Sequence, residues 1–177
     1  MTATPELIVA KMENVAVAHA NSIYTLTATE FAFSVTTTAE MESTFDFNIK
    51  FPEQRLKNTG TLAFDWQVGA GAAASATGGS LVSSHADGIH VDTVKLPLTT
   101  LCATTCPVGS YTITVKGFMN TDEVFPQTTG EFYLTVSDRT QSDALAMEGR
   151  IDNNLVANVE PRIVNTVATA VRTPDPA

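Results

Sequence analysis

Short segments in which apolar and polar residues alternate constrain this sequence more than any other feature. Segment 45–50 places Phe45, Phe47 and Ile49 on one parity and polar or charged residues on the other, and the same alternation recurs over 62–68, 111–115 and 132–136. Because successive side chains of a strand point to opposite faces, each segment has one apolar and one polar face. The pattern predicts an all-β fold, an antiparallel β-sandwich. We expect the following side chains to be buried in its core: Phe45, Phe47, Leu62, Phe64, Trp66, Ile113, Val115, Phe132 and Leu134. On the opposite parity, we expect Thr112, Thr114 and Asp65 to be largely exposed.

The length and charge of the chain limit its organisation and its partners. A chain of 177 residues fits one domain with a well-filled core and an arm, and we place the sandwich at 1–149. We expect residues 150–177 to form an extended C-terminal arm or an additional strand. The net charge of −9 and the lack of a basic cluster argue against nucleic acid and anionic lipid as partners. No apolar run approaches the roughly 20 residues of a spanning helix, so we expect no membrane insertion.

Between the strands, the sequence predicts turns and a linker. Asn58-Thr59-Gly60 is expected to be a turn that leads into strand 62–68. The small residues of 69–80 predict a flexible linker between sheets, or a recognition loop at one end of the sandwich. Pro107–Ser110 is expected to open a hairpin formed by strands 111–117 and 131–136, and residues 142–147 are a candidate short helix.

The two cysteines, Cys102 and Cys106, allow two interpretations. In an oxidising compartment they would close a small disulfide loop at the entry to a strand, since their spacing suits a turn. In a cytosol they would be two free thiols. One such pair without a second is poor evidence for zinc. We favour the disulfide, which would tie a local loop rather than the sandwich.

Two motifs carry a resemblance to a known family. Residues 109–115 (Gly-Ser-Tyr-Thr-Ile-Thr-Val) and 130–136 (Gly-Glu-Phe-Tyr-Leu-Thr-Val) resemble the last two strands of immunoglobulin-like and cadherin-like bacterial or viral modules. The segment 56–65, with Asn-Thr-Gly, is similar to a strand turn of many Ig-like domains. The resemblance covers roughly residues 40–136 and implies an Ig-like or jelly-roll-like sandwich, but no activity.

Residues after Gly149 carry a regular apolar pattern. The apolar members are four residues apart and share one parity: Ile151, Leu155, Val159, Ile163, Val167 and Val171. Their spacing admits a helix face, but Pro161 lies in the middle, and the common parity suits an extended arm. Such an arm cannot fold on itself, so we expect it to lie against its own domain or a neighbouring subunit.

Few residues carry chemistry. His85, Asp87, His90 and Asp92 form a weak candidate for a metal site, and we favour the simpler interpretation, an Asp-Gly turn leading into a strand. The acidic segment 120–123 lacks the ligand spacing of a dedicated Ca²⁺ loop. The sequence contains no nucleophile elbow, phosphate-binding loop or dinucleotide-binding motif, so it implies no enzyme, no catalytic residue and no cofactor.

We therefore expect a non-catalytic structural subunit of a surface or virion assembly, such as a capsid, decoration or filament protein. It would self-associate as a homo-oligomer, or with other structural subunits, through strand edges and the C-terminal arm. The alternative is a monomeric Ig-like recognition module that binds a glycan or protein through its end loops. A third candidate is a cytoplasmic Ig-like scaffold domain. We expect a virion or extracellular location instead, although Met1–Lys11 shows no signal-peptide pattern.

Overall fold

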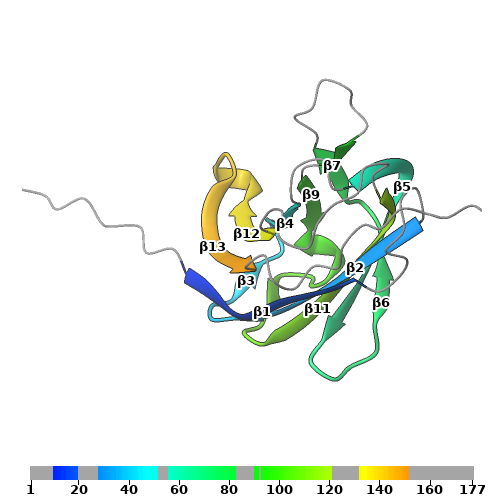
Figure 1. Cartoon of the computed structure of the whole chain (residues 1–177). Helices are drawn as coiled ribbons and strands as arrows, with labels where there is room; N and C mark the ends of the chain where they lie inside the picture. Colours follow the sequence, from blue (N-terminus) through cyan, green and yellow to red (C-terminus); the bar gives the residue numbers. More distant parts are fainter. Residues whose placement is uncertain are drawn as a thin grey trace, which may run out of the picture.

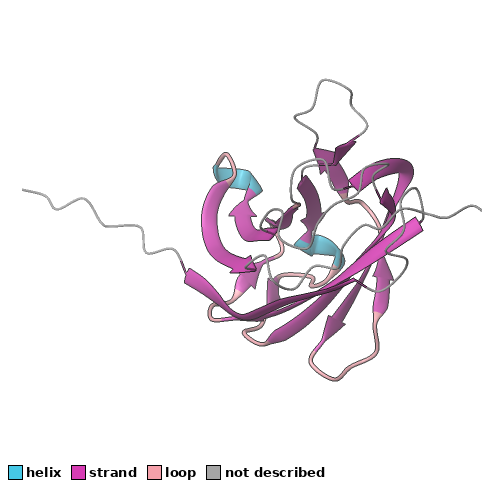
Figure 2. Cartoon of the chain, viewed as in Figure 1, coloured by secondary structure: helices cyan, strands magenta, loops and turns pink. Residues whose placement is uncertain are grey.

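A computed structural model describes residues 10–19, 28–51, 56–82, 90–91, 93–120 and 132–151. These residues form thirteen strands and two single 3₁₀ turns, at Leu98–Thr100 and Arg139–Gln141 (Figure 2). The strands are β1 (Ala10–His19), β2 (Ala28–Thr37), β3 (Met41–Glu42), β4 (Phe45–Lys50), β5 (Leu56–Val68), β6 (Ala74–Ala76), β7 (Ser80–Val82), β8 (His90–Val91), β9 (Thr93–Pro97), β10 (Thr105–Cys106), β11 (Ser110–Asn120), β12 (Phe132–Asp138) and β13 (Ala144–Ile151). The prediction of an all-β fold is confirmed.

Eleven strands form one curled sheet (Figure 1). Ten of them follow the order β6-β5-β11-β2-β1-β13-β12-β4-β9-β7. The eleventh, β8, pairs with β5 outside this order. We call β6, β5, β11, β2 and most of β1 the β11 half, and β13, β12, β4, β9 and β7 the β12 half. The separate pair β10-β3 is antiparallel. The sheet is mixed, not antiparallel throughout as the sequence predicted, because β1 and β13 are parallel neighbours.

Strand β1 joins the two halves. Ala10 and Lys11 pair with β13, whereas Met12–His19 pair with β2 across a register shift between Glu13 and Ala16. Asn14 has a φ of 50°, which turns the backbone inside this bulge. Gly149 of β13 lies beneath the crossing, where an added Cβ would be 2.9 Å from both Met12 Cβ and Val15 Cγ2. The crossing therefore requires a residue without a side chain at Gly149.

The two halves face each other across a single aromatic core. Phe33 of β2 and Phe132 of β12 have ring centroids 5.4 Å apart, and Phe47 of β4 lies 6.0 Å from Trp66 of β5. Edge-to-face rings of this kind add to the stabilisation from burial. Seven of the nine predicted core side chains are buried, namely Phe47, Phe64, Trp66, Ile113, Val115, Phe132 and Leu134. Phe45 and Leu62 are half-buried, as are Thr112, Thr114 and Asp65, which we expected to be largely exposed.

Three local predictions are wrong. Strands β11 and β12 do not form a hairpin, because β11 pairs with β2 and β5 while β12 pairs with β4 and β13. Residues 58–60 are not a turn between strands but an irregular part of β5, where Lys116 pairs with Ala63 and Phe118 pairs with Asn58. Residues 144–147 belong to strand β13 rather than a helix, since they pair with β12.

The prediction that residues 69–80 link two parts of the sheet is correct. The chain passes there from the β11 half to the β12 half, but it also forms β6, which pairs with β5. Strand β7 then pairs with β9. Among the described segments, no helix is long and apolar enough to cross a membrane.

Candidate functional site

A polar cleft opens at the surface of the β12 half. Its volume is about 360 Å³, and Asp46, Lys95 and Arg139 contribute its charged side chains. The remaining lining comes from two segments, Thr77, Gly78 and Ser80 on one side and Pro97, Thr99 and Thr100 on the other. Asp46 is only 7% exposed and is the most buried polar residue of this cleft.

The position of Asp46 follows from the alternation of β4. Phe47 and Ile49 enter the core, so Asp46 and Asn48 face the other side of the sheet. The alternating pattern predicted that this face would be solvated. It is covered by neighbouring side chains instead, because β4 lies between β9 and β12. The Asn48 Nδ2 donates to Ser137 Oγ at 2.8 Å, and the Asn48 Oδ1 has no hydrogen-bond partner among the described residues.

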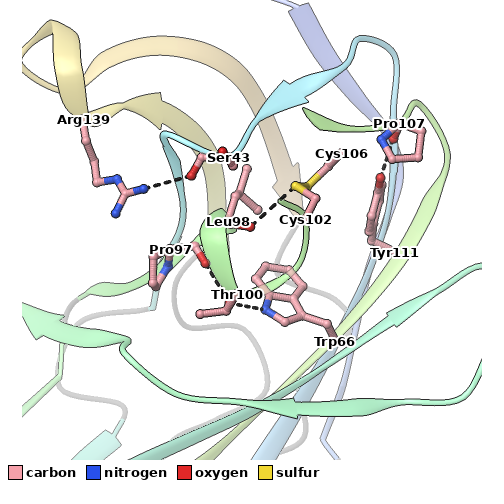
Figure 3. Close-up of a disulfide and its surroundings, with 10 residues drawn as sticks. All are labelled: Ser43, Trp66, Pro97, Leu98, Thr100, Cys102, Cys106, Pro107, Tyr111 and Arg139. Carbon is pink, nitrogen blue, oxygen red and sulfur yellow. Dashed lines mark hydrogen bonds between the residues drawn. A yellow bond between two sulfur atoms is a disulfide. The ribbon is translucent and has the colours of Figure 1, made fainter. Parts of the chain in front are cut away.

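Arg139 holds the edge of the cleft. Its Nε donates to the Thr44 carbonyl at 2.8 Å and lies 3.2 Å from Asp46 Oδ1. Its NH2 group donates to the Ser43 carbonyl at 2.9 Å, as Figure 3 shows. The short turn that carries Arg139 is capped by Asp138, whose Oδ1 accepts a hydrogen bond from the Thr140 backbone N–H. Arg139 therefore ties the β12–β13 connection to the β3–β4 turn.

The charges of the cleft nearly balance. Burial raises the pKa of Asp46, while the nearby Arg139 and Lys95 cations lower it and Asp143 raises it further. Lys95 Nζ lies 2.9 Å from Asp143 Oδ2 at the rim. Two cations and two carboxylates thus occupy the cleft and its rim, and their fields largely cancel at a distance.

A disulfide-closed loop supports one wall (Figure 3). Cys102 and Cys106 are bonded to each other, with their Cα atoms 5.4 Å apart. The Leu98 carbonyl accepts hydrogen bonds from the backbone N–H groups of Leu101 and Cys102 at 2.9 and 3.0 Å. On the far side of the loop, Ser43 N–H donates to the Thr104 carbonyl at 2.7 Å. The disulfide loop and Arg139 therefore hold the same β3–β4 turn from two directions.

Trp66 supports the same wall from the core. Its Nε1–H donates to Thr100 Oγ1 at 3.1 Å, and Thr100 Oγ1 donates to the Pro97 carbonyl at 2.8 Å (Figure 3). The indole is 3% exposed and packs against the rings of Phe47 and Phe64. Its burial confirms the predicted register and leaves its face inaccessible to a ligand.

A second polar cluster lies on the outer face of the β11 half. Lys116 of β11 and Ser75 of β6 both donate to the carboxylate of Asp65 on β5. These hydrogen bonds lower the pKa of Asp65, and the bond to Asp65 raises the pKa of Lys116. The cluster stabilises adjacent strands, and its side chains do not line the polar cleft.

Most of the predicted site residues cannot be placed. His85, Asp87 and Asp92 lie outside the described residues, and only the backbone of His90 is described, in β8. The part of the chain that is described holds no group of three His, Cys, Asp or Glu side chains that could bind a metal. The arm residues Leu155, Val159, Ile163, Val167 and Val171 also lie outside it, and the backbone of Ile151 ends β13.

The polar cleft itself was missed in the sequence. Asp46 and Asn48 were visible as polar residues on a strand, but nothing local showed that Arg139, far along the chain, would cover them. The available signal was the opposite charge of Asp46 in strand 45–50 and Arg139 just after strand 132–138.

Comparisons with known proteins do not identify the chain. No protein-family description and no curated protein matches it. Among solved structures, the bacterial hydrophobin BslA is 13% identical over 81% of this chain and 97% of its own, with a TM-score of 0.34. AvmM, described as catalysing macrocyclization in alchivemycin A biosynthesis, is 9% identical over 89% and 95%, with a TM-score of 0.42. The collagen-binding domain of Erysipelothrix rhusiopathiae surface protein RspB is 11% identical over 83% and 59%, with a TM-score of 0.31. These scores are all below 0.5, and the likenesses therefore carry no argument about function.

Proposed function

We propose that this chain is a non-catalytic structural subunit of a surface or virion assembly. Its copies would associate through strand edges and the C-terminal arm, residues 150–177. The observation that carries the proposal is an opening, among the described strands, in the curled sheet between β1 and β13. The arm begins at the end of β13, beside this opening.

The opening arises because β1 leaves β13 after two residue pairs. Ala16–His19 of β1 are hydrogen-bonded to β2 on one side and to no other described strand. Gly149–Ile151 of β13 are likewise paired with β12 alone among the described strands. A recess of about 300 Å³ lined by Lys11, Met12, Glu148 and Gly149 lies where the strands part. Unpaired strand edges are templates for the addition of another strand.

The sequence of the arm suits such an addition. Its apolar residues from Ile151 to Val171 share one parity, so an extended arm would present one apolar face. Burying that face at about 25 cal/mol per Å² would contribute several kcal/mol. The arm could add to the β1 edge of its own domain or to that of a neighbouring copy, and exchange between copies would link them.

The described surface favours edges over an apolar face as the means of association. Its exposed large apolar side chains are Val68, Val82 and Val108, and they come from three separate places in the chain. An obligate interface built on side chains needs a larger apolar patch. The Cys102–Cys106 disulfide supports an oxidising location, such as a cell surface or virion.

Deletion of residues 152–177 tests the proposal, since this truncation keeps β13 intact. Size-exclusion chromatography with light scattering should show oligomers for the full chain and monomers, or a destabilised domain, for the truncated one. Ile163→Asp should reproduce the loss, whereas Thr166→Asp adds the same charge at the opposite parity and should not. Equal oligomeric state and equal stability of the full and truncated chains would refute the role of the arm.

The polar cleft favours the second candidate function, a monomeric recognition module. It is built by loops and strand ends, as the recognition sites of β-sandwiches often are. A recognition module would remain near one chain mass of 18.8 kDa at all concentrations, which distinguishes it from an assembly subunit.

A further inference from the structure

We infer that the polar cleft of the β12 half is a binding site for a neutral saccharide. The inference deepens the recognition-module candidate and does not depend on self-association, so either can fail alone. It rests on the charge balance of the cleft, its exposed hydroxyl groups and the fixed positions of its walls.

Charge balance argues against an ionic ligand. A cation entering the cleft would meet Lys95 and Arg139, and an anion would approach the buried carboxylate of Asp46. Both cations are already paired with carboxylates, Lys95 with Asp143 and Arg139 with Asp46, so an ionic ligand of either sign would have to compete with an existing ion pair. A neutral ligand with several hydroxyl groups avoids this conflict, because each hydroxyl can both donate and accept a hydrogen bond.

The lining supplies both kinds of partner. Asp46 is an acceptor, and Lys95 and Arg139 are donors, so bonds to a ligand hydroxyl would be charge-assisted. The side-chain hydroxyls of Thr77, Ser80 and Thr99 are in exposed residues, and none of them bonds to another described side chain. These groups remain available to a ligand.

The walls are preorganised. Arg139 is held by the Ser43 and Thr44 carbonyls, and Thr100 is held between the Trp66 indole and the Pro97 carbonyl. Binding would therefore require little ordering of these side chains. The volume of about 360 Å³ lies near the lower end for small-molecule sites, which suits one or two sugar rings.

Recognition would be polar rather than aromatic. Trp66 cannot stack on a sugar, because its ring is buried between the core and the cleft wall. A small, open site without stacking predicts a dissociation constant of about 1 mM, in the range of weak binding. Fast exchange is expected at this affinity, so NMR titration is the suitable measurement.

The test is a titration of the full, ¹⁵N-labelled chain with glucose, galactose, mannose, N-acetylglucosamine and the disaccharides maltose and cellobiose. At least one should give saturable shifts of the backbone amides of Ser80, Lys95, Thr99 and Thr100. Glucosamine and glucuronic acid, which are charged sugars, should bind at least fivefold more weakly than the tightest-binding neutral sugar. Thr99→Val should weaken binding about three- to tenfold, the effect of one lost hydrogen bond. Thr105→Val, an exposed threonine outside the cleft, should leave binding unchanged.

Two results would overturn the inference. One is the absence of a saturable shift at these amides for every neutral sugar at concentrations about tenfold above the expected constant. The other is tighter binding of glucuronic acid or glucosamine than of every neutral sugar tested, which would make the cleft an ion site. A shift that is equally large in Thr99→Val and the unchanged chain would count against the cleft as its location.

Discussion

Replacement of Trp66 by Ala should remove a central contact between the two halves of the sheet. The side chain is 3% exposed and lies edge-to-face with Phe47 of the opposite half at 6.0 Å and with Phe64 at 5.8 Å. Large-to-small changes at such sites cost about 3–5 kcal/mol. With a urea m-value of about 2 kcal/mol/M, a loss of about 4 kcal/mol lowers the unfolding midpoint by about 2 M. Unfolding would be followed by far-UV circular dichroism, because the variant lacks the single tryptophan that fluorescence would report on.

Two matched variants make this prediction sharper. Trp66→Phe keeps an aromatic ring but loses the hydrogen bond to Thr100, so its cost should be smaller than that of Trp66→Ala. Val68→Ala changes the same face of the same strand at a position that is 44% exposed, and should alter the free energy of unfolding by no more than about 0.5 kcal/mol. A loss below about 1 kcal/mol for Trp66→Ala would refute the assigned register and the role of Trp66 in the core.

Three further outcomes are expected. Gly149→Ala should destabilise the fold by about 1–3 kcal/mol, measured by thermal unfolding, because the added Cβ would lie 2.9 Å from side-chain atoms of β1. Gly109→Ala is the control, since Gly109 has open space around it, and equal effects of the two changes would contradict the close approach of β1 to β13. Asp65→Asn should lower the free energy of unfolding by less than about 1 kcal/mol at neutral pH. Because the pKa of Asp65 in the folded protein is lowered from 3.8, this loss of stability should persist above pH 3.8 and vanish as the pH falls through the pKa of the folded state, which denaturant unfolding at several pH values would measure. Mass spectrometry should find the native chain two hydrogens lighter than the reduced one, whereas alkylation of Cys102 and Cys106 without reduction would contradict the disulfide.

The fold class and most of the core could be predicted because they depend on local alternation. The parities of Phe47, Trp66, Ile113 and Phe132 all match the structure, since a strand buries alternate side chains whichever strand lies beside it. Strand pairing could not be predicted in the same way. Strands β11 and β12 carry similar motifs yet lie in opposite halves, because pairing depends on contacts between distant parts of the chain.

The candidate site was harder to predict than the core. Alternation identified Asp46 as a residue of the outer face, but its burial arises from strands β9 and β12 and from Arg139. A buried carboxylate needs a nearby partner, and that partner is supplied by a turn more than ninety residues away in the sequence, as the Arg139–Thr44 separation of 95 shows. Only tertiary structure brings these groups to one cleft.

The mass of the intact chain in solution tests the central proposal most directly. Light scattering over a wide range of protein concentrations should give multiples of the 18.8 kDa chain mass, because the C-terminal arm is expected to join copies at the β1 edge that pairs with no second described strand. A single mass of 18.8 kDa at every concentration would contradict the assembly subunit and leave the recognition module as the better account.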